Sequence, residues 1–179
     1  MEQKAPRTNV MSQLAGLRRY ALSLSRHDAD AEDLVHDTLL QAYESRRSFR
    51  PDGNLQAWLM GILHNRFIDR KRSAAAMARR DEAAARLQPT FAAPQQEDSV
   101  RLAQVHRAFL ALPEEQRAAL HLVAIEELSY QEAAAVLGVP IGTVMSRISR
   151  ARERLRALEA APQGDVVPFR IVGGLDDAS

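Results

Sequence analysis

The stretch SYQEAAAVLGVPIGTVMSRISRARERLRAL, residues 129–158, decides how the rest of the chain is interpreted. Ser129 and Glu132 form a capping box, in which each side chain satisfies a backbone N–H at the start of a helix. Gly138 supplies a left-handed residue that can end this short helix, and Pro140 suits the beginning of the next one. The stretch therefore predicts two helices joined by a tight turn.

The second of these helices carries two different faces. The apolar face repeats at steps of four and three and consists of Val144, Ile148, Ala151, Leu155 and Leu158. The other face is polar and basic and consists of Thr143, Arg147, Arg150 and Arg154. A capped helix, a turn and a helix with an arginine face predict a helix-turn-helix that enters a DNA major groove. The alternative is an amphipathic helix with a solvated basic face, which would not require the capped helix before it.

The composition favours small helical cores. Of the 179 residues, 46% are hydrophobic but only 5% are aromatic, and no cysteine is present. The absence of cysteine excludes disulfides and cysteine-based zinc fingers and suits a reducing compartment. No window approaches the roughly 18 apolar residues of a membrane span, and the N-terminus has no apolar signal core. We therefore expect a soluble, cytoplasmic protein without membrane insertion.

The formal net charge of +1 conceals a separation of charge along the chain. Residues 28–37 hold five acids and no lysine or arginine, whereas residues 64–80 hold six bases and one acid. Together with the arginine face near the C-terminus, this gives one acidic and two basic segments. Such a pattern indicates two kinds of macromolecular partner.

The N-terminal half predicts three helices. The first follows Leu14, Leu17, Ala21 and Leu24, and the second is capped near Asp30. The apolar face of the second helix comprises Leu34, Val35, Thr38, Leu39, Ala42 and Tyr43, opposite a row formed by Asp30, Asp33, Asp37, Gln41 and Glu44. Asn54 caps a third helix that runs to about Arg72, in which Trp58 lies in phase with the core positions.

We predict an all-α fold of two small helical domains joined by a flexible linker. The first domain spans residues 10–73, the linker 74–98, the second domain 99–160 and a flexible tail 161–179. In the second domain Ser99 caps one helix and Pro113 begins another. The linker is rich in alanine, proline and glutamine and, fully extended, would reach roughly 80–90 Å; alternatively, the preceding helix continues into it as far as Arg86.

In the order and spacing of its motifs the chain resembles the extracytoplasmic-function (ECF, group 4) sigma factors of the σ70 superfamily. The resemblance covers roughly residues 10–160. It is carried by DAEDLVHDT at 30–38 with Tyr43, FRP at 49–51, WL at 58–59, LPEEQR at 112–117, YQEAA at 130–134, GTV at 142–144, SR at 146–147 and RAR at 150–152. Each piece is weak alone, but together they are specific.

The resemblance implies partners for the N-terminal domain. The acidic helix would dock on the β′ clamp helices of core RNA polymerase, with the β subunit as a further contact. The polymerase-binding residues would be Asp30, Asp33, Asp37 and Gln41. The loop 49–54 and the following helix would capture a flipped base of the −10 element and help to melt it, because contacts in a pocket offset the loss of stacking. The −10 residues would be Phe49, Arg50, Asp52, Asn54, Asn65, Arg66 and Arg70.

The resemblance also implies that the arginine-faced helix reads the −35 element. Its contacts would be Thr143, Ser146, Arg147, Arg150 and Arg154. Arginine paired with guanine is the commonest direct readout of a base. Met145 departs from the family, in which lysine or arginine is common there, so the −35 sequence does not follow by analogy. An anti-sigma factor that covers both domains is a further implied partner.

Two other functions compete with a sigma factor. A stand-alone helix-turn-helix regulator with an N-terminal sensing or dimerisation domain explains the C-terminal half equally well, but not the second basic segment or the acidic row. An enzyme or metal protein would have to use His27, His36 and the nearby aspartates, whose spacing matches no ligand pattern. The chain also lacks a phosphate-binding glycine loop and a nucleophile motif. We therefore expect no catalytic residues, no metal and no cofactor.

Overall fold

In the computed structural model of the protein, residues 10–78 and 97–160 are described, and only the backbone is described at 97–103 and 158–160. The described part of the chain contains helices joined by turns and no strand, so the predicted all-α class is confirmed. The predicted tail and most of the predicted linker lie outside the described residues. The elements are α1 (Val10–Ser25), α2 (Asp28–Glu44), the 3-10 helix η1 (Arg46–Ser48), α3 (Leu55–Ala78), α4 (Glu97–Ala111), α5 (Glu114–Ala124), α6 (Tyr130–Leu137) and α7 (Ile141–Ala160).

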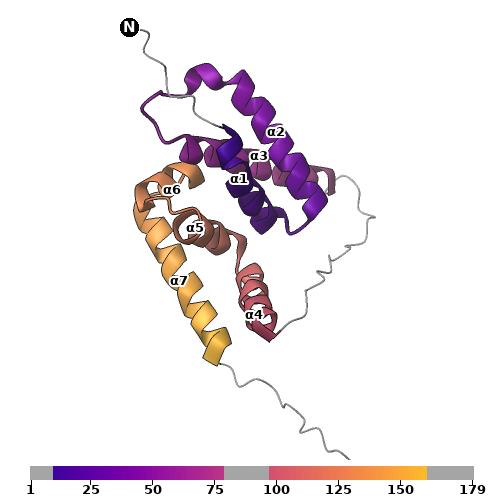
Figure 1. The fold of residues 1–179 in the computed structure, drawn as a ribbon, viewed down its shortest axis with the longest axis vertical. Helices are drawn as coiled ribbons and strands as arrows, with labels where there is room; N and C mark the ends of the chain where they lie inside the picture. The colour runs from indigo at the N-terminus through magenta and orange to yellow at the C-terminus, as the bar shows by residue number, and fades with distance from the viewer. Residues whose placement is uncertain (1–9, 79–96, 161–179) are drawn as a thin grey trace, which may run out of the picture.

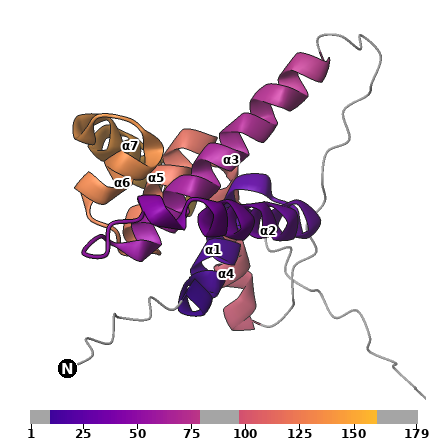
Figure 2. The ribbon, with the colours of Figure 1, turned by 90° about the horizontal axis from the view of Figure 1, so that it is seen from above.

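Helices α1, α2 and α3 form an N-terminal unit in which each helix packs against the other two (Figure 1). Leucines and Tyr20 fill its centre, because the apolar stripes of the three helices converge there. Its fully buried side chains include Leu17, Tyr20, Leu59, Met60 and Leu63. Beyond this core, α3 continues outward as a long exposed rod, which Figure 2 shows from above.

Helices α4 to α7 form a C-terminal unit, in which α5 and α6 pack on α7 and α4 contacts α7 near its far end. Val144 and Ile148 of α7 are buried against this core, as the predicted stripe requires. Small residues line the crossing of the helices and allow close approach: Ala118 and Ala119 of α5, Ala133 of α6 and Ala151 of α7 are at most 1% exposed.

The two units pack directly on each other. Helix α1 lies against α5, and α3 lies against α6. The buried side chains of both units belong to a single continuous cluster. The structure is therefore a closed arrangement in which the helix-turn-helix rests on the N-terminal unit.

The predicted signals around the helix-turn-helix are confirmed. The Ser129 side chain accepts a hydrogen bond from the Glu132 backbone N–H, and the Glu132 carboxylate accepts one from the Ser129 backbone. Gly138 ends α6 with a φ of 63°, a conformation that glycine adopts without steric penalty. Asn54 caps α3, since its Oδ1 accepts a hydrogen bond from the Ala57 N–H at 3.2 Å.

Several predicted boundaries were wrong. Helix α2 begins at Asp28 after His27, which makes no side-chain cap, so Asp30 lies in the first turn rather than at the cap. Ser99 lies inside α4, which begins at Glu97. Helix α3 runs to Ala78 instead of Arg72, because the alanine-rich sequence after Arg72 has high helix propensity. Residues 74–78 of the predicted linker are therefore helical.

Candidate nucleic-acid interface

Burial of one side of α7 leaves its basic side in solvent. Val144 and Ile148 are 0% and 2% exposed, and this fixes the rotation of the helix. The predicted −35 residues Ser146, Arg150 and Arg154 are all exposed on the same helix. Within the described residues, neither Arg150 nor Arg154 makes an ion pair. Both guanidinium groups are therefore available to phosphates and base edges without an internal contact being broken.

Arg147 differs from its neighbours on α7. Its Nη2 lies 2.7 Å from Oε2 of Glu115 at the start of α5, and its side chain is only 18% exposed. Thr143 is partly buried, and its carbonyl oxygen accepts a hydrogen bond from Ser146 Oγ at 3.0 Å. For Arg147 to contact DNA, its ion pair with Glu115 would therefore have to break.

The predicted −10 loop is a tight turn closed over an aromatic pair. The Gly53 N–H donates to the Arg50 carbonyl at 2.9 Å, and a Cβ at Gly53 would meet that same oxygen at 3.1 Å. The rings of Phe49 and Trp58 are 5.2 Å apart, centroid to centroid. Trp58 is partly buried, as its phase with the core predicts, while Arg50 and Asp52 are exposed. The loop thus presents the polar side chains of Arg50 and Asp52 beside the packed rings of Phe49 and Trp58.

Asn54 connects this loop to the helix-turn-helix. Its Nδ2 donates to Glu132 Oε1 at 2.6 Å, across the boundary between the two units. This hydrogen bond and those from Ser129 lower the pKa of Glu132, which is therefore ionised at neutral pH. One of the predicted −10 residues is thus in contact with the first helix of the predicted −35 reader.

The acidic row of α2 and the basic segment of α3 meet along one line. Asp37 Oδ2 lies 2.6 Å from Arg70 Nη2, and Gln41 Oε1 accepts from Arg66 Nη2 at 2.5 Å. Asp30 and Asp33 on α2, and Asn65 on α3, are exposed. The charge pattern predicted that the acidic row and the basic segment are separate surfaces. The structure brings Asp37 and Gln41 of the acidic row into direct contact with Arg70 and Arg66 of the basic segment.

Comparisons with known proteins follow this division of the chain. A family profile described as "Sigma-70 region 2" matches residues 10–77, and one described as "Sigma-70, region 4" matches residues 102–155. The "ECF RNA polymerase sigma factor EcfG" of Rhodopseudomonas palustris is 38% identical over 155 residues, which cover 85% of this chain and 83% of that protein. The chain belongs to the ECF sigma factors. It is an alternative sigma factor of transcription initiation, as the sequence motifs predicted.

Other known proteins are similar over most of the same region. The "ECF RNA polymerase sigma factor SigM" of Mycobacterium tuberculosis is 38% identical over 143 residues, 79% of this chain and 70% of that protein. Among solved structures, the sigma factor RpoE of Bartonella quintana, in complex with the anti-sigma factor NepR, is 36% identical with a TM-score of 0.75. The match covers 86% of this chain and 96% of RpoE. CnrH, in complex with the cytosolic domain of CnrY, is 31% identical with a TM-score of 0.61 and 86% coverage of each chain.

Two large apolar side chains of this sigma factor are exposed on α2, which the sequence pattern did not predict. Tyr43 was assigned to the core but is 67% exposed, with the Arg46 guanidinium 4.5 Å from its ring centroid. Leu40 is 53% exposed beside the acidic row and was not named. Their helical positions explain the exposure, because each lies about 100° around α2 from a buried or partly buried neighbour, Leu39 or Ala42.

Among the side chains that the structure describes, in residues 10–78 and 104–157, no group of three or more histidines, aspartates or glutamates could hold a metal ion. Over the same residues, no helix combines the length and the apolar character that a bilayer span requires.

Proposed function

We propose that this sigma factor binds core RNA polymerase and directs it to promoters that carry −10 and −35 elements. The observation that carries the proposal is the presence of one basic surface on each unit, joined to an acidic helix. A single DNA-binding surface would suffice for a stand-alone regulator. The match of region 2 to residues 10–77 also disfavours that regulator.

The N-terminal unit is proposed to dock on polymerase through α2. Asp30 and Asp33 are exposed and charged, and Leu40 and Tyr43 add apolar area beside them. A mixed acidic and apolar helix face suits a partner with basic and apolar side chains. We assign this contact to the β′ clamp helices, including Asp37 and Gln41, and a further contact to the β subunit. This role belongs to the domain proposed at residues 10–73, and DNA reading at −35 to the domain proposed at 99–160.

DNA reading is proposed to be divided between the units. The loop with Phe49, Arg50, Asp52 and Asn54 captures an extruded −10 base, while Asn65, Arg66 and Arg70 hold the strand. Melting requires no catalytic group, since stacking and hydrogen bonds to the extruded base offset the energy of unpairing. In the major groove, each well-placed arginine of α7 contributes about 1–3 kcal/mol of discrimination.

Transcription from genomic templates with purified core polymerase tests this proposal. The expected result is new start sites that appear only when both polymerase and this protein are present, with shared sequences upstream of the mapped starts. A mobility-shift assay with the protein alone supplies the contrast. Tight binding to duplex DNA without polymerase, together with no new start site, would favour the stand-alone regulator and contradict the sigma function.

An anti-sigma factor is proposed as a second partner, and the cytoplasm as the site of action. The structural relative RpoE was solved in complex with the anti-sigma factor NepR. Affinity purification from the native host tests the partner. Recovery of the protein only in free form or with polymerase, under every growth condition, would count against it.

A further inference from the structure

Two large apolar side chains lie in solvent at the start of α7. Ile141, the first residue of the helix, is 49% exposed, and Met145 is 54% exposed. The two positions are four residues apart, so they lie one above the other along the same side of the helix. We term this pair the apolar edge of α7. Every other exposed residue of α7 up to position 157 is polar or is glycine or alanine.

Packing of the C-terminal unit does not account for the apolar edge. Val144 and Ile148, at 0% and 2% exposed, mark the side of α7 that faces the core. Among the described residues, the apolar cluster of the protein includes these two side chains and Leu155, but neither Ile141 nor Met145. The fold is therefore complete without the apolar edge, which remains accessible to a partner outside the chain.

The apolar edge borders the polar side of the same helix. At about 100° per residue, Ser146 and Arg150 lie about 40° apart around α7, and Met145 lies about 100° from Ser146. All three side chains are exposed. The outward surface of the first turns of α7 is thus polar at its centre and apolar along one border.

A helix that enters a major groove brings the borders of its outward surface to the DNA as well as the centre. With its side chains a helix is about 10–12 Å across, and the groove is about 12 Å wide. The N-terminal residues of a recognition helix lie closest to the base edges. Met145 belongs to the second turn of α7, so in such a complex its side chain leaves water and faces the DNA.

Only one group in the major groove matches an apolar side chain. Base edges present hydrogen-bond donors and acceptors, and thymine adds the apolar C5-methyl group. Phosphate oxygens that lose water beside a thioether gain no hydrogen bond in return. Methionine is unbranched and polarizable, so it adapts to the shape of an apolar target. A thymine methyl group is therefore the contact that suits Met145.

The charges around the apolar edge favour DNA over a protein as its partner. The exposed charged residues of α7 up to position 157 are four bases and one acid: Arg150, Arg152, Arg154, Arg156 and Glu153. A polyanion that covers the apolar edge gains from this excess of positive charge. A protein would have to supply acidic side chains at matching positions around an apolar patch.

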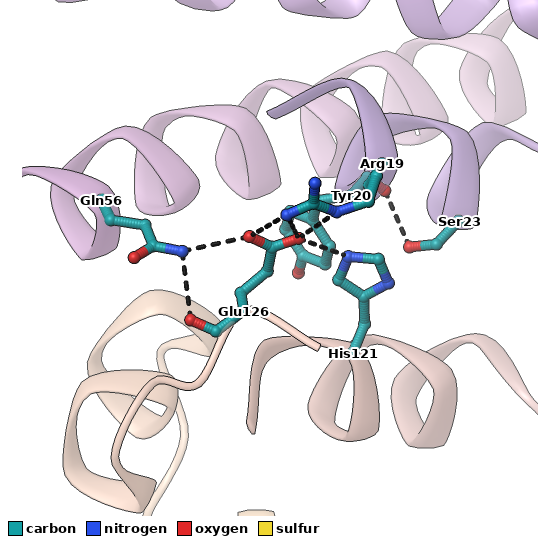
Figure 3. Close-up of polar contacts among 6 residues, drawn as sticks. All are labelled: Arg19, Tyr20, Ser23, Gln56, His121 and Glu126. Atoms are coloured by element: carbon teal, nitrogen blue, oxygen red, sulfur yellow. Dashed lines mark hydrogen bonds and ion pairs between the residues drawn. The ribbon is translucent and has the colours of Figure 1, made fainter. Parts of the chain in front are cut away.

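The helix that carries Met145 is firmly supported by its own unit. His121 Nε2 of α5 lies 3.2 Å from Glu126 Oε1 and donates to it, which holds the turn that leads to α6 (Figure 3). Ser129 then caps α6, and Val144 fixes the rotation of α7. Discrimination of a single methyl group requires such support, because a gap of about 0.5–1 Å forfeits a quarter to a half of the contact energy.

We propose that Met145 is a specificity-determining residue of this sigma factor, which selects a thymine in the −35 element by apolar contact with the C5-methyl group. The inference rests on the proposed function, because it requires α7 to enter the major groove of that element. Ile141 extends the apolar surface by one turn. The −35 element is therefore expected to contain an A·T pair at one fixed position.

Replacement of thymine by deoxyuridine tests this contact, because it removes the methyl group and leaves base pairing intact. Each A·T pair of a mapped −35 element is substituted in turn, and transcription is measured with core polymerase at limiting holoenzyme. For the unchanged protein, we expect one substitution to lower transcription about fourfold, the effect of one buried methyl group. With Met145→Ala, the same substitution should change transcription by less than about 1.5-fold, since the apolar partner is absent.

Two further variants serve as controls. Met145→Leu keeps an apolar side chain of similar volume and should keep most of the discrimination between thymine and uracil. Met77→Ala makes the same truncation at a methionine that is 67% exposed near the end of α3, and should keep all of it. Chemical denaturation should show equal stability for the unchanged protein and Met145→Ala, because the side chain is exposed.

The outcomes separate the thymine contact from the proposed function. If Met145→Ala leaves the thymine-to-uracil ratio unchanged at every A·T pair, or the mapped −35 element has no such pair, the inference is overturned. A uniform loss of transcription with Met145→Ala on all templates also overturns it and indicates a protein partner at the apolar edge. If the unchanged protein yields no new start site with polymerase, the proposed function fails and the thymine contact with it. The first two failures leave transcription from the natural promoter by the unchanged protein intact, so they are distinguishable from the last.

Discussion

Arginine has opposite roles in two regions of this protein. Arg117, between α1 and α5, is 1% exposed and donates to carbonyl groups of both units. Arg150 and Arg154, on the outer side of α7, are exposed, and neither makes an ion pair within the described residues. The difference shows that burial and partners decide whether an arginine fastens the fold or remains available for the proposed contact with DNA. Arg70 is an intermediate case, since it is 40% exposed and paired with Asp37.

The largest effect is expected from Arg117→Ala. The change leaves the buried carbonyl groups of Ser23 and Leu112 without a donor, so we expect the free energy of unfolding to fall by about 3 kcal/mol. Chemical denaturation measures it. Arg117→Lys keeps the charge but loses the planar fork, and should recover only part of the stability. Full recovery with lysine would mean that charge rather than geometry holds the interface.

A smaller and purely functional effect is expected from Arg150→Ala. Loss of one arginine on the reading face should reduce transcription from a −35-dependent promoter roughly 5- to 150-fold. This range corresponds to about 1–3 kcal/mol of lost discrimination. Unfolding should change by less than about 0.5 kcal/mol, because the side chain is exposed. Arg156→Ala removes the same charge from another side of α7 and is the control. Equal loss in both variants would indicate a general charge effect without base reading.

Arg70→Ala should shift two binding steps in opposite directions. Asp37 loses its internal partner, so polymerase no longer competes with an ion pair for this carboxylate. We expect binding of core polymerase to tighten by at most about fivefold, the usual limit for an exposed pair. Binding of −10 DNA should weaken through the lost charge. Fluorescence anisotropy measures each step, with the exposed Arg72→Ala as control. Weakening of both steps would contradict the proposed overlap of the two surfaces.

The smallest effect concerns pH. Burial raises the pKa of Glu126, but the hydrogen bonds and charges of His121 and Arg19 outweigh it, so the pKa is lowered in the folded protein. The contribution of this carboxylate to stability is therefore complete above about pH 4.3 and is lost as the pH falls through the lowered value. Small-angle scattering should detect expansion in acid. Glu126→Gln removes this titration, and the difference between the two proteins isolates it from other carboxylates such as Glu132. Identical acid profiles would exclude Glu126 as the titrating group.

Local sequence signals predicted the helix-turn-helix correctly. The partners Ser129 and Glu132 are three residues apart, and Gly138 needs only its own backbone freedom to end α6. Both features depend on residues within about one helical turn of each other, so the sequence alone is enough to predict them. The same locality explains the correct assignment of Asn54 to the start of α3.

The contacts between the units were invisible to the same reasoning. Arg19 and Glu126 are 107 residues apart, and no periodic pattern links them. Arg117 follows two acids at the start of α5 and resembles an ordinary surface arginine on that helix. Tyr43 was misassigned because its aromatic ring favours burial, whereas the rotation of α2 is fixed by the neighbouring Leu34 and Val35. Tertiary packing, rather than propensity, decided each of these positions.

In the contact between Asn54 and Glu132, each side chain uses one atom for its own helix and another for the opposite unit. Asn54 uses Oδ1 to cap α3 and only Nδ2 to reach Glu132. Glu132 uses Oε2 for the Ser129 N–H and only Oε1 to accept from Asn54. Each side chain thus serves its own helix with one atom and the other unit with the second. Separating the units at this point breaks only the hydrogen bond between Asn54 and Glu132. Both helix caps stay intact, so neither helix end has to unfold.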